Sequence, residues 1–109
     1  MAEHVHVAVV GYGYWGSKHV RVLSSMPGVA VTVVDSDVGR LREAAAHYPA
    51  VEATAERIDQ VLDRVDAVLV ATPPASHVDV AMRALTARKH VLVEKPLATS
   101  VKDAEALVS

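Results

Sequence analysis

Residues 5–16 read Val-His-Val-Ala-Val-Val-Gly-Tyr-Gly-Tyr-Trp-Gly, and this stretch decides the fold. The run from Val5 to Val10 is typical of a buried β-strand. It leads directly into Gly11, Gly13 and Gly16, which have the spacing G-x-G-x-x-G at the start of a segment with helical spacing. In that motif the first glycine permits a tight turn, the second lets a pyrophosphate approach the backbone, and the third allows the helix to pack closely on the strand. The stretch therefore predicts a turn that binds a dinucleotide.

Outward from this stretch, short valine-rich runs alternate with longer segments whose apolar residues recur at helical spacing. The predicted strands are Val5–Val10, Val29–Val34, Ala50–Ala53, Asp66–Ala71 and His90–Glu94. The predicted helices are Tyr14–Met26, Val38–Tyr48, Thr54–Leu62 with Thr54 as its cap, Ser76–Ala87, and a last one that begins near Thr99 or Ser100. This alternation predicts an α/β fold, a Rossmann-type doubly wound parallel sheet in the order 3-2-1-4-5, truncated before the last strand.

Composition limits the kinds of protein this can be. At 109 residues, we expect one domain spanning residues 1–109. A net charge of −2 without blocks of like charge argues against nucleic acid or an anionic membrane as partner. The absence of cysteine excludes a disulfide framework and a thiolate nucleophile. Because no basic residue precedes Lys18 and the apolar runs are short, we expect a cytoplasmic protein.

Asp35 is the acidic partner expected of such a glycine turn. It lies 19 positions after Gly16, at the end of the second predicted strand, where a carboxylate can accept hydrogen bonds from both ribose hydroxyls of an adenosine. A 2′-phosphate in the same place would be repelled, so the sequence favours NAD over NADP as the cofactor. Arg40, five residues further on, is either a cofactor contact that swings toward this site or a solvated helix residue.

Two further motifs follow later strands: Thr-Pro-Pro-Ala-Ser-His at 72–77 and Glu-Lys-Pro at 94–96. Both come at the carboxyl ends of predicted strands, which form the edge of an open α/β sheet where ligands bind. Together with the glycine turn and Asp35, they make the whole chain resemble the glucose-fructose oxidoreductase, inositol dehydrogenase and rhizopine-catabolism (Gfo/Idh/MocA) family of nicotinamide-dependent oxidoreductases. In that family such a domain is followed by a C-terminal substrate and dimerisation domain, which is absent from these residues.

The resemblance implies an oxidoreductase that acts on CH–OH groups of a sugar, a sugar derivative or a polyol, and that is a homo-oligomer through its second domain. It implies that Lys95 is the catalytic lysine, which reaches toward the nicotinamide and hydrogen-bonds the substrate oxygen. Glu94 orients Lys95 or contacts a ribose. Since the family's main acid-base residue lies on the other domain, we expect these 109 residues to bind NAD with reduced affinity and to catalyse no turnover.

The remaining candidate residues have more than one interpretation. Thr72, Pro73 and Pro74 are predicted to form a wall beside the nicotinamide ribose, a role compatible with simply ending the strand. His77 either hydrogen-bonds near the cofactor or packs in its helix. The aromatic residues of the glycine turn pack against the cofactor or against the absent domain; they are Tyr12, Tyr14 and Trp15. No metal site is predicted, because His4 and His6 lack a third ligand nearby.

Two other functions remain open from the residues alone. One is a stand-alone NAD-binding sensor or interaction module, which would share every cofactor residue but would not need Lys95. The other is a methyltransferase that uses S-adenosylmethionine, since such enzymes also combine a glycine-rich turn with an acidic residue after the second strand. The glycine spacing suited to a diphosphate and the two proline-containing loops argue against this second alternative.

Overall fold

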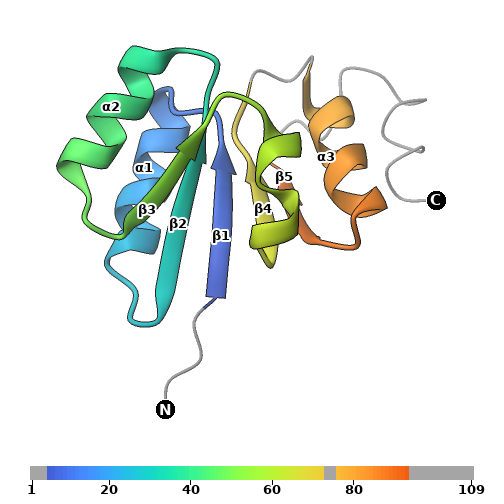
Figure 1. Ribbon diagram of the computed structural model, residues 1–109, viewed down its shortest axis with the longest axis horizontal. Helices are drawn as coiled ribbons and strands as arrows, with labels where there is room; N and C mark the ends of the chain where they lie inside the picture. Colours follow the sequence, from blue (N-terminus) through green and yellow to red (C-terminus); the bar gives the residue numbers. More distant parts are fainter. Residues whose placement is uncertain (1–4, 73–75, 94–109) are drawn as a thin grey trace.

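The computed structural model describes residues 5–72 and 76–93, which form a single sheet flanked by helices (Figure 1). The strands are β1 (Val5–Val10), β2 (Val29–Val34), β3 (Val51–Ala55), β4 (Ala67–Val70) and β5 (His90–Val93). The helices are α1 (Tyr14–Ser24), α2 (Val38–His47) and α3 (His77–Thr86), and the 3-10 turns are η1 (Ile58–Gln60) and η2 (Leu62–Arg64).

The sheet has the predicted topology. All strand pairs are parallel and the spatial order is β3-β2-β1-β4-β5, so the 3-2-1-4-5 prediction is confirmed. The chain leaves β1 toward β2 on one side and later returns to place β4 on the other side. The point between β1 and β4 is therefore the topological switch point, where open α/β sheets bind their ligands beyond the carboxyl ends of the strands.

Each face of the sheet is covered by different elements, as Figure 1 shows. Because side chains alternate along a strand, Val9 contributes to one face while its neighbours Ala8 and Val10 contribute to the other. Helices α1 and α2 cover the face of Val9, where Val20 and Leu41 are buried. Helix α3 and the 3-10 turns cover the other face.

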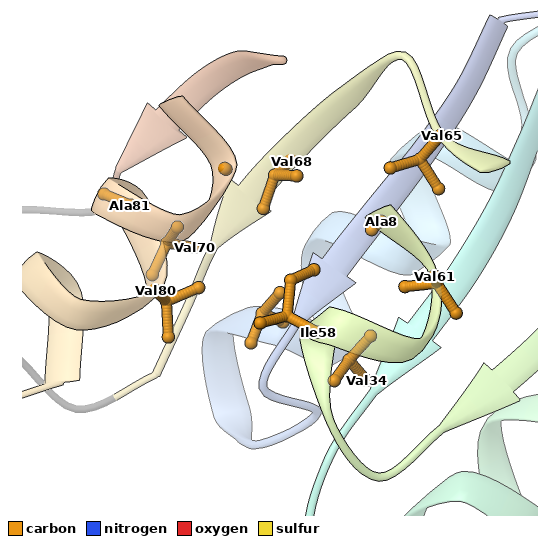
Figure 2. Close-up of a cluster of buried hydrophobic side chains, with 11 residues drawn as sticks. Ala8, Val34, Ile58, Val61, Val65, Val68, Val70, Val80 and Ala81 are labelled. Atoms are coloured by element: carbon orange, nitrogen blue, oxygen red, sulfur yellow. The ribbon is translucent and has the colours of Figure 1, made fainter. Parts of the chain in front are cut away.

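The core on the α3 face is built almost wholly from small aliphatic side chains, and Figure 2 shows Ile58 of η1 lying near Val34 in this cluster. Val80 of α3 lies near Val70 of β4 in the same view. Valine and alanine suit this position because β-branched side chains pack well on a pleated sheet and short ones let helices approach closely. The abundance of these residues in the sequence therefore has its explanation in a sheet that is covered on both faces.

The predicted helix over Thr54–Leu62 was wrong. Thr54 lies within β3 and pairs with Val33, and the two short turns η1 and η2 follow instead of a helix. Pairing of β3 with β2 extends as far as Ala55. The register shifts after Val51, because Val31 pairs with Val51 whereas the next residue, Thr32, pairs with Ala53. The Gln60 side chain then accepts hydrogen bonds from the N–H groups of residues 56 and 57, which fixes a tight turn.

The other element boundaries agree with the predictions to within two residues. Helix α1 ends at Ser24 rather than at Met26, and the predicted strand Ala50–Ala53 is found as Val51–Ala55. The last predicted helix, near Thr99, lies outside the described residues. Within residues 5–72 and 76–93, no helix is both long and apolar enough to cross a bilayer.

Candidate functional site: a groove at the carboxyl edge of the sheet

A groove of about 770 Å³ lies at the carboxyl edge of the sheet. Its walls come from the glycine turn, the ends of β2 and β4, the turn η1 and the first part of α3. Most of the predicted site residues that the structure describes line it: Gly11, Gly13, Tyr14, Trp15, Asp35, Arg40, Thr72 and His77. The structure therefore brings together, in one groove at the switch point, residues that are up to 66 positions apart in the sequence.

Gly11 makes the sharp turn at the end of β1. Its φ of +98° lies in the region that favours glycine, and a Cβ there would lie 2.9 Å from the carbonyl carbon and oxygen of Ala71. Its N–H donates to the carbonyl of Val34 at 2.7 Å. Gly11 is therefore required by the fold itself, because β1 and the residues after β4 approach each other here too closely for any side chain.

The other two glycines of the motif differ from each other in what surrounds them. A Cβ on Gly16 would overlap the carbonyl oxygen of Gly11 and lie 2.7 Å from its carbon, so Gly16 lets α1 pack against the turn. A Cβ on Gly13 would meet nothing closer than Arg40 Nη1 at 3.8 Å. Gly13 has φ −90° and ψ −150°, an extended backbone outside the left-handed region that favours glycine, and packing does not require a glycine there. The empty space over Gly13 opens to the groove.

Helix α1 begins at this space. Gly13 is its N-cap and makes no side-chain cap hydrogen bond, and the first turn carries no acidic residue. The first N–H groups of a helix have no partner within the helix, and the helix dipole adds partial positive charge there. The start of α1 can therefore receive the phosphates of a ligand that lies over Gly13.

Asp35 lies where the sequence predicts it, at the end of β2, but it already has two partners. Its side chain is 7% exposed. Oδ2 accepts a hydrogen bond from the N–H of Tyr12 at 2.8 Å, and Oδ1 accepts one from the N–H of Asp37 at 2.8 Å. Since each carboxylate oxygen has two lone pairs, both oxygens can accept a further hydrogen bond from a ribose hydroxyl.

Arg40 lies closer to the site than a solvated helix residue would. Its Nη1 is 3.7 Å from Oδ2 of Asp35, and its Nε is 3.9 Å from Oδ2 of Asp37. The side chain is half exposed and lines the groove beside Gly13. The structure thus places Arg40 at the groove, and its contact with a cofactor stays a prediction.

His77 is one of the residues that line the groove. It is 1% exposed, at the first position of α3, and its Nε2 lies 2.7 Å from the carbonyl oxygen of Thr72. Since a carbonyl only accepts, Nε2 carries the proton and donates. His77 is therefore packed and fixes the chain just after β4, and its hydrogen bond near a cofactor stays a prediction.

The three aromatic residues of the turn have different surroundings. Tyr12 is buried under the turn, and this burial raises the pKa of its phenol. Tyr14 and Trp15 line the groove and are 70% and 58% exposed, with their rings in an edge-to-face contact at 5.2 Å. The ammonium of Lys18 lies 4.6 Å from the ring centre of Tyr14. Tyr14 and Trp15 are thus available to a ligand, whereas Tyr12 supports the turn from below.

A set of charged residues at the rim of the groove was not predicted. Arg83 of α3 donates from Nη1 to Asp59 of η1 at 2.7 Å and from Nε to Asp79 at 3.2 Å. Arg57 donates to the same Asp59 oxygen at 3.3 Å. The hydrogen bond from Arg83 lowers the pKa of Asp59. Only the Asp79–Arg83 pair had a sequence signal, the four-residue spacing on one helix, because Asp59 and Arg83 are 24 residues apart.

Several predicted site residues lie outside the described part of the chain: Pro73, Pro74, Glu94 and Lys95. Their roles therefore stay predictions. Among the residues that the structure does describe, no cluster of three or more His, Asp or Glu side chains could hold a metal ion.

The residues of the groove fit a dinucleotide with two phosphates. The space over Gly13 is one that a single Cβ would enter, next to the free N–H groups at the start of α1. Asp35 offers lone pairs at the end of β2, on one side of the switch point. On the other side, the buried hydroxyl of Thr72 has no hydrogen-bond partner within the described structure. A buried polar atom without a partner is uncommon, and here it belongs to a residue that lines the groove.

Comparisons with known proteins agree with this geometry. Residues 5–109 match the profile of the Gfo/Idh/MocA family, described as an oxidoreductase family with an NAD-binding Rossmann fold. The chain is 40% identical over 100 residues to an inositol 2-dehydrogenase of Mycolicibacterium gilvum, covering 89% of this chain and 29% of that protein. It is 36% identical over 106 residues to a 4-carboxy-2-hydroxymuconate-6-semialdehyde dehydrogenase of a Sphingobium species, covering 95% of this chain and 34% of that protein.

Among solved structures, the fold is similar to that of GenD2 from gentamicin A biosynthesis, crystallised in complex with NAD. The TM-score is 0.88 at 39% identity, and the match covers 98% of this chain and 31% of GenD2. The chain thus spans about a third of the length of the proteins it matches.

Proposed function

This chain belongs to the Gfo/Idh/MocA oxidoreductase family and has the fold of its NAD-binding domain, and from that premise we propose that it is the cofactor-binding part of an oxidoreductase that acts on a CH–OH group of a sugar, a sugar derivative or a polyol. The cofactor is NAD. The observation that carries the proposal is the groove at the switch point, which is lined together by Gly13 with the open space over it, by Asp35 and by Thr72.

Each of these residues has a role in holding the cofactor. The first N–H groups of α1 receive the pyrophosphate over Gly13, and Asp35 accepts hydrogen bonds from the adenosine ribose. Thr72, which His77 holds in place, contacts the nicotinamide half across the switch point. When bound, NAD would supply a hydride acceptor for the carbon that carries the hydroxyl group, while the hydroxyl proton would pass to the acid-base residue expected on the further domain. In the proposal, Lys95 hydrogen-bonds the substrate oxygen and stabilises its developing charge.

The substrate class rests on the relatives. The Mycolicibacterium protein is named for inositol, and GenD2 takes part in the biosynthesis of gentamicin A. The Sphingobium relative is named for a semialdehyde, so the cofactor domain alone does not determine the substrate. The substrate contacts are accordingly proposed to lie in a further domain of the kind the family carries, together with the interface of a homo-oligomer.

The proposal includes the partners and the compartment. With 11 basic and 13 acidic residues and no block of like charge, the chain has little attraction for nucleic acid or an anionic membrane. We propose a cytoplasmic protein whose partners are the dinucleotide and a small polyol or sugar.

Competitive calorimetry on the 109-residue chain tests the cofactor assignment. NAD should bind with a stoichiometry of one, NADP at least about tenfold more weakly because its 2′-phosphate is repelled by Asp35, and S-adenosylmethionine should not compete. Binding of S-adenosylmethionine in preference to NAD would favour the methyltransferase and overturn the proposal.

The oxidoreductase assignment is tested on the longer protein that carries this domain. Lys95→Ala should reduce kcat for inositol or sugar oxidation by at least about 100-fold while changing the NAD affinity by less than about threefold. Lys95→Arg, which keeps the charge but changes its geometry, is the matched control for fold and charge. If Lys95→Ala leaves all measured behaviour intact, the stand-alone sensor or interaction module is the better assignment.

A further inference from the structure

The carboxylate of Asp35 joins two turns that are far apart in the sequence. Its Oδ2 holds the N–H of Tyr12 in the glycine turn, 23 residues earlier, and its Oδ1 holds the N–H of Asp37 in the turn before α2. Both distances are 2.8 Å, and the Asp35 side chain is almost fully buried. The backbone N–H of Asp35 itself donates to the carbonyl of Ala55 at the end of β3, so the backbone that carries this side chain is also held in place.

Tyr12 is held at both its backbone and its ring. Its ring packs in the cluster that contains Val9, Val33 and Leu41, under the turn. The preceding N–H, of Gly11, goes to a strand carbonyl, whereas the N–H of Tyr12 goes to Asp35. A buried N–H that loses a charged acceptor keeps its full desolvation cost. Without Asp35, the segment that leads into Gly13 and α1 would lose its fixed position.

Arg40 strengthens the same connection. Its Nη1 lies 3.7 Å from the Asp35 oxygen that holds Tyr12, and it is also the atom nearest to the space over Gly13. The acidic residue, the cation and the phosphate-binding turn are therefore in contact before any ligand arrives. Preorganisation of this kind raises affinity because the ordering cost is met in the free protein.

We propose that Asp35 is a positioning residue for the phosphate-binding turn, in addition to the ribose contact that the proposed function gives it, and this inference rests on that function. Asp35 holds the turn through the N–H of Tyr12, so its removal weakens binding even of a nucleotide that has no ribose hydroxyls. A residue that served the ribose alone would not affect such a ligand.

Two nucleotide probes separate the two roles: ADP and 2′,3′-dideoxyadenosine 5′-diphosphate, which lacks both hydroxyls. Their affinities are measured by calorimetry for the unmodified chain, for Asp35→Asn and for Asp37→Asn. Asparagine at 35 has one acceptor oxygen, and its NH₂ group would face the second N–H donor. Asp37→Asn is the matched control, because it removes the same charge from the neighbouring turn and preserves a good N-cap for α2.

Asp35→Asn should weaken the binding of the dideoxy probe at least about fivefold and should weaken the binding of ADP further. Asp37→Asn should change both affinities by less than about twofold. Unchanged affinity of Asp35→Asn for the dideoxy probe would overturn the inference and leave the proposed function standing. If the unmodified chain binds neither ADP nor NADH, the proposed function fails and the inference fails with it.

Hydrogen exchange gives a second test, which is made first on the unmodified chain and then on Asp35→Asn. The amide of Tyr12 should exchange at least about tenfold more slowly than that of Trp15, which lies in the first turn of α1 where helical geometry supplies no acceptor. In Asp35→Asn the protection of Tyr12 should fall while that of Val9 in β1 stays unchanged. Equal, fast exchange of Tyr12 and Trp15 in the unmodified chain would contradict the proposed positioning role.

Discussion

Gly13→Ala separates binding from folding more cleanly than any other change in the glycine turn. The new methyl group would lie 3.8 Å from its nearest neighbour, Arg40 Nη1, so it creates no clash within the protein. The backbone at φ −90° and ψ −150° is extended and lies outside the left-handed region that favours glycine. Two small effects on stability oppose each other: alanine is the poorer N-cap by about 0.5–1 kcal/mol, and it reduces the entropy of the unfolded chain by about 0.4–1 kcal/mol.

We therefore expect the free energy of unfolding of Gly13→Ala to stay within about 0.5 kcal/mol of the unmodified chain. Affinity for NADH should nevertheless fall at least about tenfold, which corresponds to about 1.4 kcal/mol, because the methyl group occupies the space that the pyrophosphate needs. Urea unfolding followed by circular dichroism measures the first quantity, and calorimetric titration with NADH measures the second.

Gly39→Ala is the matched control for this experiment. It makes the same chemical change near the start of α2, where the added Cβ would lie 3.1 Å from Asp37 Oδ1 and outside the groove. It should leave the NADH affinity within about twofold. If Gly13→Ala binds NADH as tightly as the unmodified chain, the placement of the phosphates over Gly13 is refuted. If it instead loses more than about 2 kcal/mol of stability, the space over Gly13 is not open.

Three further changes test other parts of the structure. Gly16→Ala should lower the free energy of unfolding by at least about 2 kcal/mol in urea melts, because its Cβ would overlap the carbonyl oxygen of Gly11; a smaller loss would mean that α1 shifts easily. The pKa of Asp59 lies below its usual 3.8, chiefly because Arg83 donates a hydrogen bond to its carboxylate. The contribution of Asp59 to the free energy of unfolding is therefore complete above pH 3.8 and is lost as the pH falls through the pKa that Asp59 has in the folded protein. Asp59→Asn should therefore flatten the acid side of the stability profile, and an unchanged acid slope would show that the pair contributes nothing. His77→Phe should lower the free energy of unfolding by about 1–2 kcal/mol, because the carbonyl of Thr72 loses its hydrogen-bond donor. His77→Gln keeps an N–H donor and should lower the free energy of unfolding by less in parallel urea melts. Equal losses in the two variants would argue against the hydrogen bond.

Much of the fold follows from local patterns in the sequence. The valine-rich runs, the G-x-G-x-x-G turn and the spacing of apolar residues predict the five strands and their order, since right-handed crossovers leave few other topologies. The error at Thr54–Leu62 has a physical cause. Thr54 has the character of a helix cap and is followed by Ile58 and Val61 at helical spacing, but pairing with β2 holds Thr54 in a strand. Long-range pairing overrode local propensity there.

The candidate site was predictable in its membership but not in its contacts. The positions of Gly11, Gly13 and Asp35 follow from the motif, and the structure places them at one groove. That Asp35 already holds the N–H of Tyr12 depends on how β1 and β2 lie side by side, which the spacing of the motif does not specify. The same is true of the pair Asp59–Arg83, which joins two elements on the α3 face across 24 residues.

Trp15 provides the most direct measurement of the central claim, that the groove at the switch point binds NAD. It is the only tryptophan of the chain and lines the groove, so its fluorescence reports on this site alone. Titration with NADH should quench Trp15 saturably with a stoichiometry of one, and Gly13→Ala should shift the midpoint at least about tenfold to higher concentration. Absence of any saturable change at NADH concentrations up to about 1 mM, which corresponds to a binding free energy weaker than about −4 kcal/mol, would contradict the assignment of this groove as the NAD site.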